Sequence, residues 1–277
     1  MVALTVLAES EPSIADTLYR RFFTGAITLV LTAGASWGVW ILWQIGRAAK
    51  FNGAALQDVN AHGQAQIYGW MGLFIMGFAY QAFPQVWHTQ LVAPRAAVGV
   101  FLAMVTGVIL RTFGMTLGSG SGTAILVAML GCGLQVVAIL TFAFQIIATF
   151  RRSLTRMDPY IGFIFGGLFW FVAMSLLDSW HTYATLSAKT REELLWHVAT
   201  YQAPLRDMQI HGLAMFMILG VSIRKLPGFF GVPATPRRRG WWALAILSVA
   251  VVAECVLFVA YRWSGSHILA AFLMIPW

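Results

Sequence analysis

Residues 62–84 read HGQAQIYGWMGLFIMGFAYQAFP, and this stretch decides which class of fold the chain can adopt. A histidine and two glutamines occupy its first turns, and the continuous apolar run that follows does not alternate apolar with polar residues. About 20 helical residues cross a hydrocarbon core of about 30 Å, and continuous apolar runs favour helices over a membrane barrel. The stretch therefore predicts a transmembrane helix whose first turns carry polar side chains.

The remainder of the chain shares this apolar character. Its 277 residues are 59% hydrophobic and 10% charged, and the mean hydropathy is +0.75, whereas soluble domains carry about 25% charged residues. We expect an all-α, polytopic transmembrane helical bundle of about seven spans, surrounded by the lipid bilayer. The spans are expected near residues 23–45, 64–86, 96–117, 123–149, 160–184, 208–226 and 241–262. The last stretch, 265–277, is too short to span and should form a half-helix or an interfacial helix.

The positions of Lys and Arg relative to these spans predict the orientation in the membrane. The net charge is +8, but these side chains lie at span ends, which indicates sidedness and no affinity for nucleic acid. Eleven lie on the side of the N-terminus: Arg20, Arg21, Arg95, Arg151, Arg152, Arg156, Arg224, Lys225, Arg237, Arg238 and Arg239. Seven lie on the other side: Arg47, Lys50, Arg111, Lys189, Arg191, Arg206 and Arg262. We expect a multi-pass protein of the bacterial inner membrane whose N-terminus is cytoplasmic.

The segments outside the apolar runs carry further expectations. Residues 1–22 should form a cytoplasmic N-terminal segment, and their mixed polarity does not match a cleavable signal peptide. The loop 185–207 should lie outside and contain an interfacial helix on the membrane surface, and the loop 226–240 should lie inside. Cys132 and Cys255 fall within predicted spans, and the chain has no CxxC or CxxCH motif. Any heme would therefore be bound non-covalently.

A second stretch repeats much of the first. Residues 209–227 read QIHGLAMFMILGVSIRKLP, and QIHG at 209–212 aligns with QIYG at 66–69 without gaps through Pro227 and Pro84. Both predicted spans run from outside to inside, which suggests a parallel repeat of four-helix units, 23–150 and 160–277, within a single transmembrane domain, 23–277. The alternative is that Gly and Pro recur by chance in an apolar chain.

Histidines at the outer ends of three predicted spans are candidate ligands for a cofactor. The six histidines are His62, His88, His181, His197, His211 and His267. Ionisable residues at membrane depth are costly and suggest function, and imidazole is a common axial ligand of heme iron. We expect His62 and His211 to ligate the iron of a heme b, with His181 or His197 as alternates. The competing interpretation is that each histidine anchors a span end at the interface.

Neighbouring residues are consistent with a flat apolar cofactor. Gln66 and Gly69 share a helical face with His62, and Arg111 and Arg206 on the outer side could pair with heme propionates. The alternatives are close helix packing for the glycine and snorkelling for the arginines.

The heights of the two proposed ligands along their helices do not match. His62 lies six residues farther from its matched proline than His211 does, an offset of about 9 Å along level helices.

The stretch AHGQAQIYGW at 61–70, with Pro84 after it, resembles the heme-ligating helix of heme-copper oxidases and nitric oxide reductases. It also resembles the NnrS family of heme-containing membrane proteins, whose motif opens with His-x-His. His62 matches the first histidine, whereas Gln64 replaces the second. The resemblance implies a reduced version of that fold with heme, without the clustered histidines of a catalytic copper or iron site.

Two further intramembrane groups are candidates for proton chemistry. Asp178 and His181 share a face near the outer end of the fifth span and could accept protons from a quinol; the alternative is a local hydrogen bond. Glu254 lies near the middle of the seventh span, where a charge is costly.

These observations favour a membrane b-type cytochrome subunit that relays electrons between the quinone pool and a partner redox protein. Its partners would be other subunits of a membrane redox complex, including an outer-side electron-transfer protein. The first alternative is an NnrS-like heme protein that binds or senses nitric oxide. The second is a structural membrane subunit without a cofactor.

Overall fold

A computed structural model describes residues 14–118 and 121–274, and every regular element in these ranges is helical. The elements in chain order are α1 (Ile14–Leu29), η1 (Val30–Ser36), α2 (Trp37–Ala48), η2 (Phe51–Gly53), α3 (Leu56–Gln64), η3 (Ala65–Gly72), α4 (Leu73–Val86), α5 (Pro94–Thr116), α6 (Gly122–Arg152), α7 (Pro159–Ser187), α8 (Arg191–Asp207), η4 (Met208–Met215), α9 (Phe216–Phe230), α10 (Arg237–Ser264) and α11 (His267–Phe272). The segments η1, η3 and η4 are π-helical, and η2 is a 3-10 turn. The all-α fold expected from the sequence is confirmed.

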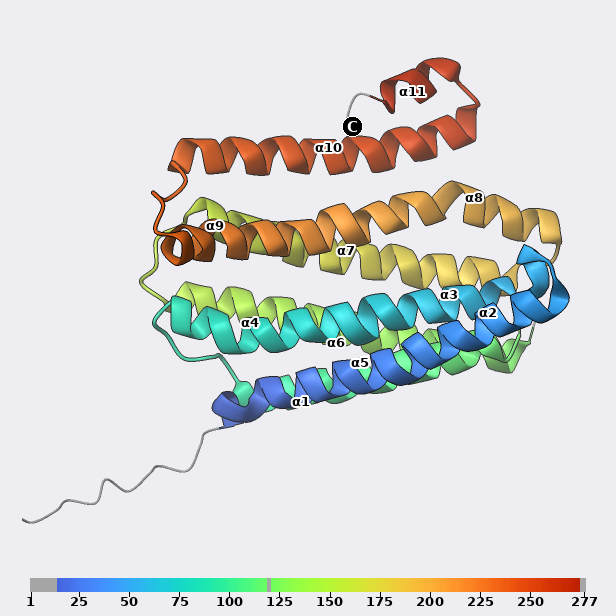
Figure 1. Cartoon of the computed structure of the whole chain (residues 1–277), viewed down its shortest axis with the longest axis horizontal. Helices are drawn as coiled ribbons and strands as arrows, with labels where there is room; N and C mark the ends of the chain where they lie inside the picture. The colour runs from blue at the N-terminus through green and yellow to red at the C-terminus, as the bar shows by residue number, and fades with distance from the viewer. Residues whose placement is uncertain (1–13, 119–120, 275–277) are drawn as a thin grey trace, which may run out of the picture.

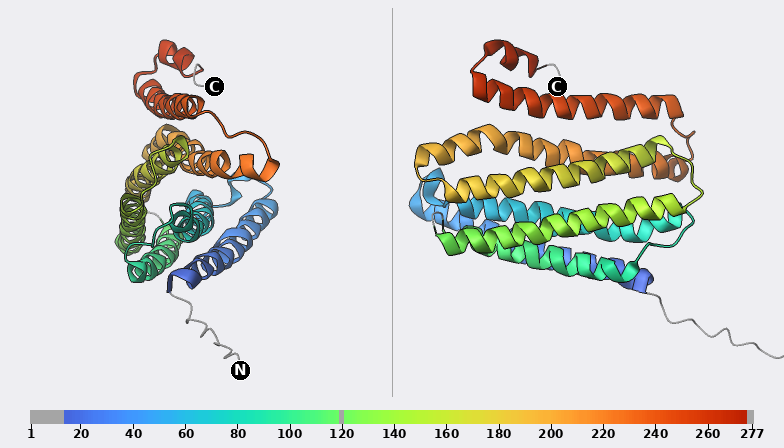
Figure 2. Two further views of the ribbon diagram at one scale, coloured as in Figure 1. Left: turned by 90° about the vertical axis from the view of Figure 1, so that its left-hand side faces the viewer. Right: turned by 180° about the vertical axis from the view of Figure 1, so that it is seen from behind.

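The long helices lie side by side along the longest axis of the molecule, and successive ones run in opposite directions (Figure 1). The π-helical segments do not interrupt the helices that contain them, so α1 continues through η1 into α2, and α3 continues through η3 into α4. Helix α10 packs against α7 and α8 at one edge of the bundle, and α11 folds back along α10 (Figures 1 and 2).

Six helices in the described part of the chain are long and apolar enough to cross a membrane. They are Thr17–Ala48, Pro94–Thr116, Gly122–Arg152, Pro159–Ser187, Arg191–Phe230 and Arg237–Ser264. The protein is therefore a multi-pass membrane protein. The helix formed by α3, η3 and α4 lies beside them in the bundle, but it is not among the six. Gln66, Gln81 and Pro84 interrupt its apolar run. The seventh span remains a prediction.

Two boundaries differ from those expected. The first apolar helix begins at Thr17, inside the segment 1–22 that was expected to be cytoplasmic. The helix expected in 185–207 is present, but it is not a separate segment. Helix α8 begins after Thr190, whose hydroxyl accepts the Glu193 N–H at 3.1 Å, and continues directly into η4 and α9. Because α8 packs against α7 and α10, it prolongs the bundle. Trp196 and Tyr201 in this stretch suggested the interfacial position.

The two stretches that resemble each other in sequence have the same unusual backbone. The gapless alignment that pairs 66–69 with 209–212 also pairs both ends of η3 (Ala65–Gly72) with both ends of η4 (Met208–Met215). Pro84 and Pro227, which the alignment also pairs, both lie inside their helices. π-Helical turns are rare and are frequent at functional sites. The duplication remains a prediction, and the shared backbone is what it would produce.

Helices α5 and α6 make the closest helix contact through small residues. A Cβ added at Gly131 would lie 2.4 Å from the Arg111 backbone nitrogen, and one at Gly114 would lie 2.4 Å from the Ala128 nitrogen. Small residues allow such close approach, which is a main source of helix association in lipid. This contact fixes the position of Arg111 on α5 against α6.

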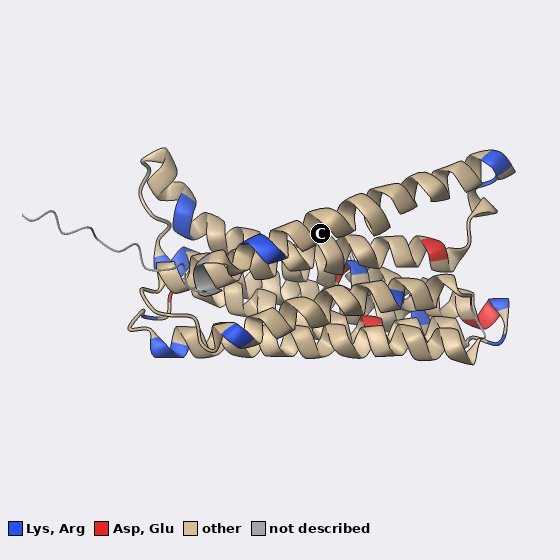
Figure 3. Cartoon of the chain, turned by 90° about the horizontal axis from the view of Figure 1, so that it is seen from below, with Lys and Arg blue, Asp and Glu red and all other residues tan. Residues whose placement is uncertain are grey.

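Most charged residues lie toward the two ends of the bundle, and a few lie between them (Figure 3). Charges at membrane depth are rare and mark the functional parts of membrane proteins by default. The few interior charges in Figure 3 therefore direct attention to the middle of the bundle.

Candidate functional site: two polar clusters inside the bundle

An ion pair between α5 and α7 forms the centre of the first cluster. The Arg111 Nη2 lies 2.7 Å from the Asp178 Oδ1, and the two side chains are only 2% and 6% exposed. The sequence suggested that Arg111 would reach the surface or a heme propionate. Instead, it is buried, because the glycine contact between α5 and α6 holds its helix deep in the bundle.

Neutral polar groups surround this ion pair. The Arg111 guanidinium donates to the Thr182 hydroxyl at 2.6 Å and to the Gln135 Oε1 at 3.2 Å. Gln135 donates to the Gln64 Oε1 at 3.3 Å, and Gln64 donates to the Thr112 hydroxyl at 2.6 Å. The chain of hydrogen bonds therefore links α7, α5, α6 and α3. Such a network satisfies most of the polar groups that lipid cannot.

A small polar cavity adjoins the ion pair. Its volume is about 20 Å³, which is room for about one water molecule. Asp178 and His181 line it from α7, and Arg206 and Gln209 line it from α8 and η4. The Nε2 of His181 is buried without a hydrogen-bond partner in the described part of the chain. The cavity is far too small for a porphyrin.

The second cluster lies where α8 and η4 meet α10. The Nδ1 of His211 lies 3.0 Å from the Asp207 Oδ1 and 3.9 Å from the Glu254 Oε2. One ligand atom from each of the three residues lies within 4.8 Å of the other two. Glu254 is the single charged residue in the run 240–261, and it is buried against these partners.

This arrangement has the chemistry of a metal site. Imidazole and carboxylate together suit divalent transition metals, and the same ring atom of His211, Nδ1, faces both carboxylates. Asp207 and His211 are one helical turn apart, so the helix holds their side chains on one face. Glu254 comes from another helix, and only the packing of α10 brings it into reach.

The structure does not bring His62 and His211 together. The Nδ1 of His62 lies 3.1 Å from the Gly34 carbonyl oxygen, and its ring lies against Gly38, so it faces the first helix. His211 faces Asp207 and, on α10, Glu254. The two histidines therefore occupy different helix interfaces.

The surfaces expected to receive a porphyrin are filled by side chains. A Cβ at Gly69 would lie 3.2 Å from Leu29 and 3.3 Å from Val108, and one at Gly212 would lie 2.7 Å from the Trp170 ring. Gln66 packs at Gly34. The residues present do not fit a heme held between His62 and His211 in this arrangement of helices.

The other predicted residues have separate environments. Arg206 donates to the Gln209 Oε1 at 2.7 Å, so it takes part in the polar cavity. His197 lies among aromatic rings, with its ring centroid 5.8 Å from Trp180 and 5.1 Å from Trp196. His88 and His267 are exposed.

The sequence singled out Glu254 as costly but did not assign it to the site, and it passed over Asp207. One signal could have found the latter: Asp207 lies four residues before His211, the spacing that places two side chains on one helical face. Nothing in the sequence could have matched Glu254 to this pair, because the match depends on the rotation of α10.

No protein-family model, no curated protein and no solved structure matches this chain.

Proposed function

We propose that the protein binds a divalent transition-metal ion within the membrane, through Asp207, His211 and Glu254, and exposes it to a small ligand. The observation that carries the proposal is the approach of one imidazole and two carboxylates to within 4.8 Å of one another on helices that are apolar enough to span a membrane.

The negative charges of Asp207 and Glu254 favour a bound cation between them. Two carboxylates in a poorly solvated environment repel each other, and a lone acid in an apolar helix is costly. A divalent cation would neutralise both carboxylates, whereas His211 can supply at most one positive charge. A metal ion would thus balance the charges that the tertiary structure has gathered.

The ligand set limits the choice of ion. Nitrogen and oxygen donors without thiolate favour Fe²⁺, Mn²⁺ or Zn²⁺ over Cu⁺. Cys255, the neighbour of Glu254, donates its thiol to the Pro204 carbonyl oxygen at 3.6 Å and is engaged elsewhere. Three protein ligands leave at least one position open on any of these ions. A small molecule that partitions into lipid, such as the nitric oxide suggested by the NnrS resemblance, is the ligand class we propose.

The electron-relay interpretation of the sequence remains a prediction. It requires a heme b, for which the interfaces of His62 and His211 offer no room as they stand, and a quinol site in which Asp178 is free to take a proton. Asp178 is paired with Arg111, so its carboxylate is already engaged. A visible spectrum of the purified protein, oxidised and reduced, tests this interpretation directly.

Metal analysis tests the proposal. The protein is purified from cells grown with iron, manganese and zinc, and its metal content is measured by mass spectrometry. We expect about one ion per chain, lost in Glu254→Gln and in His211→Ala but kept in His267→Ala, which alters an exposed histidine of α11. Iron(II)-loaded protein should then change its spectrum on addition of nitric oxide. Equal metal content in Glu254→Gln and in the unaltered protein would refute the site.

A further inference from the structure

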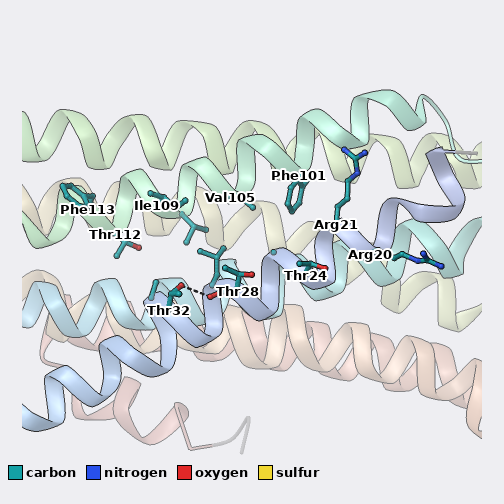
Figure 4. A pocket seen from close by; sticks show the side chains of 14 residues that line it. Arg20, Arg21, Thr24, Thr28, Thr32, Phe101, Val105, Ile109, Thr112 and Phe113 are labelled. Atoms are coloured by element: carbon teal, nitrogen blue, oxygen red, sulfur yellow. Dashed lines mark hydrogen bonds between the residues drawn. The ribbon is translucent and has the colours of Figure 1, made fainter.

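A long apolar groove runs along the outside of the bundle between the first helix and α5. Its volume is about 680 Å³. Two parallel rows of side chains border it (Figure 4). Thr24, Thr28 and Thr32 form one row at four-residue spacing, and Phe101, Val105, Ile109 and Phe113 form the other. Because both rows follow the four-residue spacing of a helix, the groove is straight and parallel to the bundle axis.

The interior of the groove is apolar although threonines line one side. The Thr32 hydroxyl donates to the Thr28 carbonyl oxygen at 2.7 Å, which turns its polar group toward its own helix. Ala33 adds only a methyl group to the first helix, and Gly25 lets the Phe101 ring pack against that helix, since an added Cβ there would lie 2.7 Å from the Phe101 Cε2. A hydrocarbon chain is therefore the natural content of this surface.

Positive charge gathers at one end only. Arg20 and Arg21 line the groove at its end nearest the N-terminus (Figure 4), and both are exposed. None of the residues that line the groove is acidic. Arginine binds phosphate with paired hydrogen bonds as well as with charge.

The length of the groove matches one leaflet of a bilayer. From Thr32 to Arg20, and from Phe113 to Phe101, the helices rise about 18 Å. Half of a hydrocarbon core is about 15 Å thick. Arg20 lies in the first turn of the apolar helix that begins at Thr17, so a leaflet that begins at this end of the helix would bring its phosphates to the guanidinium.

We propose that this groove binds an anionic phospholipid from the leaflet on the side of the N-terminus. One acyl chain would lie between the threonine row and the Phe101–Phe113 row, and the phosphate would contact Arg20 and Arg21. The proposal is independent of the metal site, which lies on other helices. A neutral isoprenoid chain would fill the same groove but would have no use for the two guanidinium groups.

Photocrosslinking tests the proposal. Phosphatidylglycerol or phosphatidylcholine with a diazirine in one acyl chain is mixed at low fraction into vesicles of unlabelled phosphatidylcholine that contain the full chain. Crosslinked peptides are identified by mass spectrometry. We expect phosphatidylglycerol to label peptides 17–33 and 101–113, and phosphatidylcholine to label them about tenfold less, which corresponds to about 1.4 kcal/mol.

Three variants make the test specific. Arg20→Gln together with Arg21→Gln should reduce the labelling by phosphatidylglycerol to the level of phosphatidylcholine. Arg151→Gln together with Arg152→Gln removes an exposed arginine pair at the same end of the bundle and should change it less than twofold. Thr28→Trp, which fills the groove, should suppress labelling by both lipids. Equal labelling by the two lipids, or an equal loss in the control pair, would overturn the proposal, as would displacement by an isoprenoid quinone but not by phosphatidylglycerol.

Discussion

Removing one partner of the buried Arg111–Asp178 pair should destabilise the bundle far more than removing both. At 2.7 Å and an effective dielectric constant of about 20, the attraction between the two charges is about 6 kcal/mol before desolvation is subtracted. Arg111→Met leaves the Asp178 carboxylate buried without a counter-charge, and Asp178→Asn does the same to the guanidinium. Each single variant should lose about 3–5 kcal/mol of unfolding free energy.

The double variant removes both charges at once. It still loses the hydrogen bonds to Gln135 and Thr182, at about 1 kcal/mol each. We therefore expect a total loss of about 2 kcal/mol, so that the coupling energy between the two sites is at least about 4 kcal/mol. Reversible unfolding by dodecyl sulfate in mixed micelles measures all four proteins of this cycle.

An exposed pair in the same chain serves as the control. The Arg237 Nε lies 2.9 Å from the Asp158 Oδ1, but these side chains are 66% and 37% exposed. The same cycle there should give at most about 1 kcal/mol. If the Arg111–Asp178 coupling is as small as that of the control pair, then the two charges are hydrated in the folded state, and the buried network described above is wrong.

Other predictions concern packing, topology and the cofactor. Gly131→Leu should push α5 away from α6 and lower the unfolding free energy by several kcal/mol. Gly133→Leu, on an open face of α6, should change it by less than about 0.5 kcal/mol. The same micelle assay compares the two variants. With an N-terminus in the cytoplasm, an impermeant thiol reagent added to intact cells should label Lys189→Cys and spare Arg238→Cys, and the reverse pattern would invert the orientation. If a heme b is bound through His62, His62→Ala should abolish the Soret band of the purified protein, and a wild-type protein without that band rules out the relay.

Local properties of the chain sufficed to predict the helices. Hydropathy summed over about 20 residues identifies a membrane helix because each helix satisfies its own backbone hydrogen bonds in lipid. The likeness of 66–84 and 209–227 carried no expectation of π-helical turns, although both stretches contain one. The sequence of 185–207 predicted a helix there but not its direct continuation into the next span, because that continuation depends on the packing of α8 against α7 and α10.

Only the tertiary structure decided which polar groups meet. Arg111, Asp178 and Gln64 lie on three helices, and their network depends on how far the glycines let α5 approach α6. The same holds for Glu254, which reaches His211 only because α10 packs against α8 and η4. Hydropathy fixes that a helix crosses the membrane but leaves its rotation and depth open, since these follow from side-chain packing against neighbours far away in the sequence. For that reason, individual histidines could be predicted as ligands from the sequence. The packing of the helices decided that His211 meets two carboxylates and lies apart from His62.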